Sequence, residues 1–275
     1  TTLLGSDDKA GVAVIMQLAA DLLADPAPRP TLRLLFTPDE EIGKGTEYLD
    51  LARFGADVAY TLDGSGTDRL NVETFNAAEA VLTVDGVVVH PGYATGVLVN
   101  AARIAAAFVA ALPAEEAPET TSGRDGYFYA HTLTGDTSRA EARVLLRDFG
   151  DVGMARRKAF VQQLADDLAA RHPKATIRVA LTDSYRNMLR YIEEADRRVI
   201  DVAVEAAHAM GFEPELELVR GGTDGARLSE KGLPTPNVFT GGYDFHSCFE
   251  WNTIENLERA LAYAKTLVHT WGERE

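Results

Sequence analysis

The chain has 275 residues, of which 46% are hydrophobic and 25% charged, an ordinary globular composition. This length exceeds the usual size of one domain, so we expect two domains, or one domain with a large insertion. Acids outnumber bases by 42 to 27, giving a net charge of −15. Because no stripe of Lys and Arg occurs, we expect no nucleic-acid partner. The single cysteine, Cys248, excludes an internal disulfide framework and any metal site built from cysteines.

No apolar run approaches the roughly 20 residues that a membrane-spanning helix requires, so we expect no membrane partner. The stretch TTLLGSDDKAG at the amino end has neither the basic start nor the apolar region of a secretory signal. A chain with one cysteine also suits a reducing compartment. These features together predict a cytoplasmic protein.

The first elements predict an α/β layer. Apolar residues recur at helical spacing over 11–25, behind the acids Asp7 and Asp8, and predict a helix. The runs 31–37 and 56–64 are short, contain β-branched or aromatic residues, and end in acids or glycines, which predicts two strands. In such a layer the loops at the carboxyl ends of the strands carry the chemistry.

From about residue 75 the pattern predicts an inserted domain. Its elements are a strand, a helix, two strands around a turn, a helix and a strand, over 78–90, 96–112, 127–136, 141–149, 155–172 and 175–185. The β-α-β-β-α-β order is that of the split ferredoxin-like unit. We therefore expect one discontinuous α/β domain, 1–74 with 188–275, and one inserted domain, 75–187. The last part of the chain predicts helices over 193–211 and 254–269 and strands over 215–219 and 237–242.

Three adjacent acids, Asp39, Glu40 and Glu41, stand directly behind the run 31–37. Adjacent carboxylates repel one another, and partial burial raises the pKa of at least one of them unless a cation lies among them. The crowding of these acids therefore has two interpretations. Either the loop is exposed to solvent, or it binds a positively charged group.

A metal ion would account for the acids. Asp7, Glu41, Asp63 and His246 each end or follow a predicted element of the same α/β domain. Carboxylates and imidazole are the ligands that zinc, manganese or cobalt accept when thiolates are absent. Glu41 would then be a ligand, and Glu40 a base that takes a proton from a metal-bound water. Against this, any one acid among 42 is more often a surface charge or a helix cap, and His246 alone also fits a packed loop histidine.

Three further residues are candidates for substrate contacts. His90 ends the predicted strand 78–90, where it also fits a simple strand terminator before a proline turn. Arg147 and Arg220 can each grip a carboxylate through a forked guanidinium, although a surface salt bridge is the commoner role for Arg147. Arg220 opens RGGTDG, a tight turn whose backbone N–H groups suit an anion.

The motifs of several other enzyme classes are absent from the sequence. It contains no GxSxG, HExxH, GxxxxGK[ST] or GxGxxG. Serine hydrolases, zincins, P-loop proteins and dinucleotide-binding folds therefore lose support.

The motifs that are present resemble one family along the whole chain. LGSDDKAGV, FTPDEEIGKG, AYTLDG, RDF, DSYRNM, RGGTDGA and FTGGYDFHSCFE follow one another as in the dizinc peptidases that include carboxypeptidase G and succinyl-diaminopimelate desuccinylase. Within that family the chain is most similar to the tripeptide aminopeptidases. The resemblance implies a catalytic metal-binding domain over 1–74 and 188–275, and a ferredoxin-like lid or dimerisation domain over 75–187.

The resemblance also implies a role for each metal-site residue. Asp7 would bridge two zinc ions, with cobalt or manganese as alternatives, Glu41 and Asp63 would each bind one ion, and His246 would complete the ligands. Glu40 would be the general base. The Asp7–Asp8 peptide bond lies where the family has a cis bond.

For the substrate, a tripeptide, the resemblance implies three contacts. His90 of the lid would stabilise the developing oxyanion, and Arg147 and Arg220 would hold the terminal carboxylate. A carboxylate held at a fixed distance from the metal ions would select peptides by length. A homodimer formed through the lid domain is a further expectation.

The sequence departs from the family in one element. The His-x-Asp that supplies a zinc ligand and its orienting acid does not occur, since none of the six histidines has an Asp two residues later. We therefore expect that the N-terminal part of the natural protein is missing and that at least one metal site is weakened. Two alternatives stay open, namely a related dizinc amidohydrolase or dipeptidase acting on another acylated amino acid, and a fragment without catalytic activity.

Overall fold

The computed structural model describes residues 5–274 and divides the chain into two compact units. The first unit combines residues 1–74 with 187–275, and the second comprises 75–186. Each unit has its own four-stranded sheet and its own buried core. Asn187 belongs to the first unit, because its side chain caps the helix that follows and donates to Glu73 at 2.8 Å.

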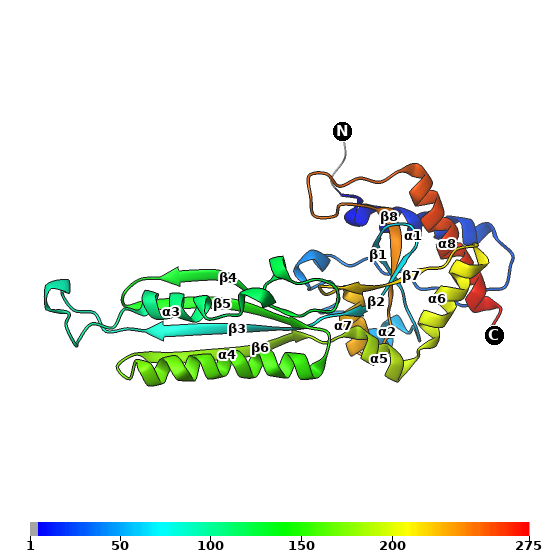
Figure 1. Cartoon of the computed structure of the whole chain (residues 1–275). Coiled ribbons are helices and arrows are strands. Elements are labelled where there is room, and N and C mark those ends of the chain that lie inside the picture. Colours follow the sequence, from blue (N-terminus) through cyan, green and yellow to red (C-terminus); the bar gives the residue numbers. More distant parts are fainter. Residues whose placement is uncertain (1–4, 275) are drawn as a thin grey trace. The chain divides into compact units, whose positions relative to one another are not determined.

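The sheet of the first unit has the strand order β1-β8-β2-β7 (Figure 1). Its strands are β1 (Thr61–Ser65), β2 (Arg69–Thr74), β7 (Glu215–Val219) and β8 (Asn237–Gly242). β1 runs parallel to β8, β2 runs parallel to β7, and β2 and β8 are antiparallel. Every residue of β8 is buried, as expected for an inner strand.

Helices cover this sheet and contribute to its core. They are α1 (Ser6–Ala24), α2 (Leu51–Phe54), α5 (Met188–Ala195), α6 (Arg198–Ala209), α7 (Asp224–Glu230) and α8 (Ile254–Gly272). In α1 the residues Val14, Leu18 and Leu22 recur at helical spacing and are buried in the same apolar cluster as Tyr263 of α8. Tyr263 is fully buried and donates its hydroxyl hydrogen to the backbone carbonyl of Ala203 in α6, at 2.8 Å.

The prediction of a strand over 31–37 is wrong. The segment belongs to neither sheet, and Leu32, Leu34 and Phe36 are exposed. Among the described strands β1 pairs with β8 and not with this segment, and residues 30–37 and 54–63 together line a cavity of about 980 Å³. Apolar alternation alone does not make a strand, because a strand also needs a partner for its backbone hydrogen bonds. The strand predicted over 56–64 is present only as β1, from Thr61 onward.

The second unit has the predicted β-α-β-β-α-β order. Its elements are β3 (Asn76–Asp85), α3 (Ala101–Ala110), β4 (Tyr127–Gly135), β5 (Arg139–Asp148), α4 (Asp151–Arg171) and β6 (Thr176–Tyr185), with short 3₁₀ turns over Pro91–Tyr93, Ala114–Glu116 and Pro118–Thr120. The sheet order is β4-β5-β3-β6, all antiparallel. Alternate residues of β3 and β5 are buried with the apolar faces of α3 and α4, so one face of the sheet forms the core. The predicted ferredoxin-like unit is confirmed.

None of the helices that the structure describes is long and apolar enough to cross a membrane.

Candidate metal centre

Three of the predicted ligands meet at one point of the first unit. The Nε2 atom of His246 lies 3.0 Å from Oδ2 of Asp7 and 3.0 Å from Oε2 of Glu41. One ligand atom from each of the three residues lies within 4.8 Å of the others. The Asp7 side chain is 9% exposed, whereas those of Glu41 and His246 are 57% and 71% exposed, so the group opens to solvent on one side.

Local backbone geometry brings these side chains together. Asp7 lies in the first turn of α1, where its own φ and ψ and those of Asp8 are not helical and the peptide bond between them is cis, as predicted. Glu41 lies in a single 3₁₀ turn, Glu40–Ile42, that begins after Asp39 in the left-handed region. His246 also has a positive φ, 60°, which is uncommon for a residue with a side chain and characteristic of sharp functional turns.

Asp63 of β1 extends the acidic group inward. Its carboxyl is hydrogen-bonded to that of Asp7. Burial, with repulsion from Asp8, Glu40 and Asp7, raises the pKa of Asp63 to about 9. Burial and the neighbouring acids likewise raise the pKa of Asp8 to about 7, despite a hydrogen bond from the Gly11 backbone at 2.9 Å.

Glu40 faces a different partner from Glu41. Its carboxylate accepts a hydrogen bond from the backbone N–H of Asp224, at the start of α7. Burial, and then repulsion from Asp224 and Glu41, raise the pKa of Glu40 to about 7. In this structure a backbone N–H of the RGGTDG turn, that of Asp224, is therefore taken up by the Glu40 carboxyl group.

The helix α7 and Lys231, directly after it, also hold both ends of the segment 37–46, which carries Asp39, Glu40 and Glu41. The Thr37 hydroxyl donates to Oδ2 of Asp224 at 2.9 Å, and Lys231 Nζ donates to the backbone carbonyl of Thr46. Between these ends, Gly45 packs so tightly on the Asp224 carboxylate that a Cβ atom there would lie 2.3 Å from Oδ2. The segment 37–46 is therefore fixed by α7 although it belongs to no sheet.

The donors fit a divalent cation. Several carboxyls crowd together with elevated pKa values, which is the electrostatic state that a positive ion relieves. Asp7, Glu41 and His246 offer two oxygens and one imidazole nitrogen, a set that suits zinc. Asp63 and Asp7 offer a second position with carboxylate ligands alone.

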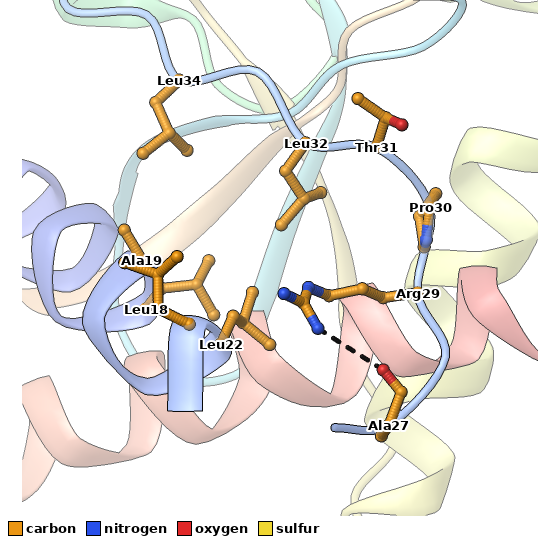
Figure 2. Close-up of a pocket in the computed structure, with 10 residues that line it drawn as sticks. Leu18, Ala19, Leu22, Ala27, Arg29, Pro30, Thr31, Leu32 and Leu34 are labelled. Atoms are coloured by element: carbon orange, nitrogen blue, oxygen red, sulfur yellow. Dashed lines mark hydrogen bonds between the residues drawn. The ribbon is translucent and has the colours of Figure 1, made fainter. Parts of the chain in front are cut away.

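The acids line one part of the cavity of about 980 Å³, together with the apolar wall formed by segments 30–37 and 54–63. A neighbouring hollow of about 620 Å³ lies between α1 and the segment 27–34 (Figure 2). There Leu18 and Leu22 of α1 face Leu32, and Arg29 donates to the backbone carbonyl of Ala27 at 3.4 Å. Both hollows leave apolar surface of α1 and of the segment 30–34 uncovered.

The second unit places the other candidates at opposite ends of its sheet. Arg147 of β5 pairs with Ala77, whereas His90 follows the other end of β3, beyond Asp85. Lys174, close to the start of β6, holds the His90 loop at this end by donating to Gly96 O at 2.6 Å. In Figure 1 this loop extends past the tip of β3. The eight steps from Ala77 to Asp85 correspond to about 26 Å of strand, so the unit does not bring His90 and Arg147 together.

The immediate surroundings of these residues also differ from prediction. His90 does not end a strand, because β3 stops at Asp85; it caps the 3₁₀ turn Pro91–Tyr93 by accepting from the Gly92 backbone at 3.1 Å. The Arg147 guanidinium donates to the backbone carbonyls of Leu146 and Ala78, at 3.0 and 3.4 Å, and lies over the Tyr185 ring. These contacts are not the surface salt bridge that is commoner for an arginine at a strand end.

Arg220 lies in the first unit, half-buried between β7 and α7. The sequence reasoning missed two other charged groups of this unit, the Asp224 carboxylate and Glu250. Both are buried polar residues in loops or helix starts, 6% and 4% exposed. Glu250 is four residues beyond His246, between Phe249 and Trp251, and the sequence alone does not distinguish it from a surface acid.

Comparisons with known proteins agree with this geometry. Residues 5–270 match the model of peptidase family M20/M25/M40. The chain is similar to proteins named peptidase T, with 44% identity over 275 residues to that of Bacillus velezensis and 44% over 261 residues to that of Salmonella schwarzengrund. These matches cover 100% and 94% of the chain but 67% and 64% of the relatives, so the chain spans about two thirds of their length.

Solved structures show the same fold. The chain is similar to an aminopeptidase PepT of Bacillus cereus, with a TM-score of 0.82 and 24% identity, covering 98% of this chain and 72% of that one. A tripeptidase of Staphylococcus aureus matches with a TM-score of 0.83 and 20% identity, covering 99% and 73%.

Proposed function

Because the chain belongs to peptidase family M20/M25/M40, we propose that it carries the metal centre of an aminopeptidase that removes the N-terminal residue of tripeptides. The observation that carries the proposal is the group of Asp7, Glu41 and His246, whose ligand atoms lie within 4.8 Å of one another. The names of the relatives, peptidase T, and of the two solved structures, an aminopeptidase and a tripeptidase, support the reaction and the substrate class.

Asp7, Glu41 and His246 would hold one zinc ion, and Asp7 with Asp63 a second; cobalt or manganese would suit the same donors. When bound, the ions would lower the pKa of a water molecule and polarise the carbonyl of the first peptide bond. The second position has only carboxylate ligands among the residues that the structure describes. We therefore expect one ion to bind tightly and the other weakly.

Glu40 would act as the general base. Its carboxylate would accept a proton from the attacking water and deliver it to the leaving amine. Burial raises the pKa of Glu40 above that of an ordinary glutamate, and a carboxylate with a raised pKa accepts a proton more readily. The hydrogen bond from the Asp224 backbone would hold the carboxylate in place between the two steps.

Arg220 and Arg147 would bind the substrate's terminal carboxylate, and His90 the developing oxyanion. A tripeptide spans at most about 10 Å, whereas about 26 Å of strand lie between the two ends of β3. One copy of the second unit therefore cannot apply both His90 and Arg147 to one tripeptide. This separation supports a homodimer in which one of the two residues acts on the substrate of the partner copy.

The test combines metal content with product analysis. Purified chain, loaded with zinc and dialysed, is expected to retain at least one zinc per chain by mass spectrometry and to release the first residue of tripeptides but not of longer peptides. Retention of no zinc would refute the metal centre. Cleavage of N-acyl amino acids or dipeptides in preference to tripeptides would instead identify a related amidohydrolase or dipeptidase, and zinc without any cleavage would identify an inactive fragment.

A further inference from the structure

Glu250 is a buried carboxylate in the loop that carries His246. The residue is 4% exposed, and its Oε1 atom accepts backbone N–H hydrogen bonds from Gly5 at 2.7 Å and from Asp7 at 3.2 Å. The backbone N–H of Ser6 also donates to this carboxylate. Successive backbone N–H groups that converge in this way bind anions. The carboxylate thus holds a three-residue segment that lies more than 240 positions earlier in the chain.

The loop itself is closed at its base. Tyr243 and Trp251 exchange backbone hydrogen bonds at 3.0 and 3.2 Å, and their rings stack with centroids 4.7 Å apart. His246 and Glu250 both lie between these two residues. Beyond the bridge, Asn252 donates to the hydroxyl of Ser6 at 3.1 Å. The loop is therefore attached to the segment 5–7 at two successive points.

Asp7 is consequently held from both sides by one loop. Glu250 binds its backbone N–H, and His246 Nε2 lies 3.0 Å from its side-chain Oδ2. Oε1 of Glu250 is engaged by the backbone N–H groups of Gly5 and Asp7, and Glu250 is not one of the three residues whose ligand atoms converge. Its negative charge can fix the position of Asp7 relative to His246 through the backbone alone.

We propose that Glu250 is a positioning residue that fixes Asp7 against His246 by binding the backbone N–H groups of residues 5–7, without contacting the metal ion. The proposal rests on the proposed function for the identity of the ligands. It assigns to Glu250 a role in metal affinity that the ligand geometry alone does not include.

The test compares Glu250→Gln and Glu250→Ala with Asp244→Asn in the whole chain. Asp244 is exposed, lies in the same loop and has a positive φ that asparagine also accepts. Its Oδ2 accepts a hydrogen bond from the Trp251 indole at 3.2 Å, which an asparagine carbonyl can also accept. The substitution therefore removes the same charge and leaves the contacts of residues 5–7 in place. Zinc affinity is measured by competition with a chromophoric chelator, and backbone exposure by hydrogen exchange of the peptide containing residues 5–7 in the metal-free protein.

We expect the zinc affinity of Glu250→Gln to fall about 10-fold and that of Glu250→Ala about 100-fold, the range typical of groups that orient metal ligands. Exchange at residues 5–7 should accelerate in the same order, while Asp244→Asn leaves both quantities unchanged. Faster exchange in α8 and β8 as well would show that Glu250→Ala opens the whole unit. In that case the result for Glu250→Gln, which keeps the side-chain size, decides whether Glu250 positions Asp7.

Two results would overturn the proposal. Unchanged exchange at residues 5–7 in Glu250→Gln, combined with lost zinc, would identify Glu250 as a direct ligand; unchanged zinc affinity in both variants would remove any role at the metal centre. Failure of the proposed function gives a different result, since the unsubstituted chain would then bind no zinc. The exchange comparison needs no metal and still decides whether Glu250 holds Asp7.

Discussion

The Thr37 hydroxyl donates a hydrogen bond to the Asp224 carboxylate at 2.9 Å, across 187 positions of the chain. This contact, with the Asp224 backbone N–H that binds Glu40, joins the acidic segment to α7. Glu40, the proposed general base, is thus held by the start of α7, and the loop between Thr37 and Thr46 does not have to hold it alone.

Asp224→Asn and Thr37→Val are therefore expected to slow catalysis without removing metal. Both weaken the attachment of the segment that carries Glu40, and a displacement of about 1 Å at a catalytic group can cost about 100-fold in rate. We expect kcat on tripeptides to fall about 10- to 100-fold with zinc content unchanged. Glu230→Gln, on the exposed side of α7, is the control and should leave kcat unaltered. A loss of zinc in step with kcat would contradict this division.

Glu40→Ala and Glu41→Ala should separate catalysis from metal binding. Glu40→Ala removes the base and is expected to abolish turnover while zinc per chain is retained. Glu41→Ala removes one of the three converging ligands and is expected to lose zinc as well. Zinc content by mass spectrometry beside initial rates distinguishes the two variants. Equal zinc loss in both would show that Glu40 is also a ligand.

The metal-free chain should lose stability as pH rises. The folded-state pKa values of Asp63, Asp8 and Glu40, about 9, 7 and 7, exceed the value near 4 of an unfolded carboxyl. Between these limits the folded state binds more protons, so the free energy of unfolding falls from about pH 4 toward pH 9. Zinc replaces those protons and should reduce or reverse the trend.

Thermal unfolding at pH 5.5 and pH 8.5, each with chelator and with zinc, measures this dependence. Asp63→Asn should flatten the metal-free dependence, because it removes the group with the largest of these shifts. A metal-free midpoint that rises with pH would show that the acids are ionised without penalty in the folded chain.

Arg157 is expected to be a stability determinant of the second unit. It is 4% exposed and lies 2.7 Å from both Glu116 and Asp148. Removing one partner of a fully buried ion pair costs about 3–5 kcal/mol; here the acids are partly exposed, so we expect Arg157→Ala to cost about 2–3 kcal/mol. Denaturant unfolding of the whole chain measures this cost, with Arg178→Ala as control. Arg178 is 70% exposed in its pair, and its loss should change stability by less than about 0.5 kcal/mol. Equal losses of unfolding free energy in Arg157→Ala and Arg178→Ala would show that burial of Arg157 does not contribute to stability.

The second unit was predictable because its signals are local. Alternating burial in β5 and the apolar stripes of α3 and α4 follow from periodicity in consecutive residues. The segment 31–37 has the same kind of alternation, yet its conformation depends on a partner strand that its own residues do not specify. The sequence therefore could not distinguish a paired strand from an uncovered segment.

The candidate site also has one part that was predictable from the sequence and one part that was not. The grouping of Asp7, Glu41 and His246 was predictable because each ends or follows a predicted element of one α/β domain and because the motifs around them resemble those of one metallopeptidase family. The attachments of Glu250 to residues 5–7 and of Thr37 to Asp224 join positions far apart in the chain. No periodicity or short motif encodes such a pair, so only the fold reveals which acids are buried and what they hold.

The placement of Asp7 and His246 near opposite ends of the chain has a consequence for biosynthesis. Residues 75–186 form a continuous unit, so this part can fold on the ribosome as soon as it has emerged. The proposed metal centre cannot form at that stage, because β8, His246 and Glu250 are translated after the second unit. The acids of the segment that bears Asp7 remain exposed to solvent until about 240 further residues have been synthesised. If these residues bind metal as proposed, metal loading must follow the synthesis of the loop that carries His246.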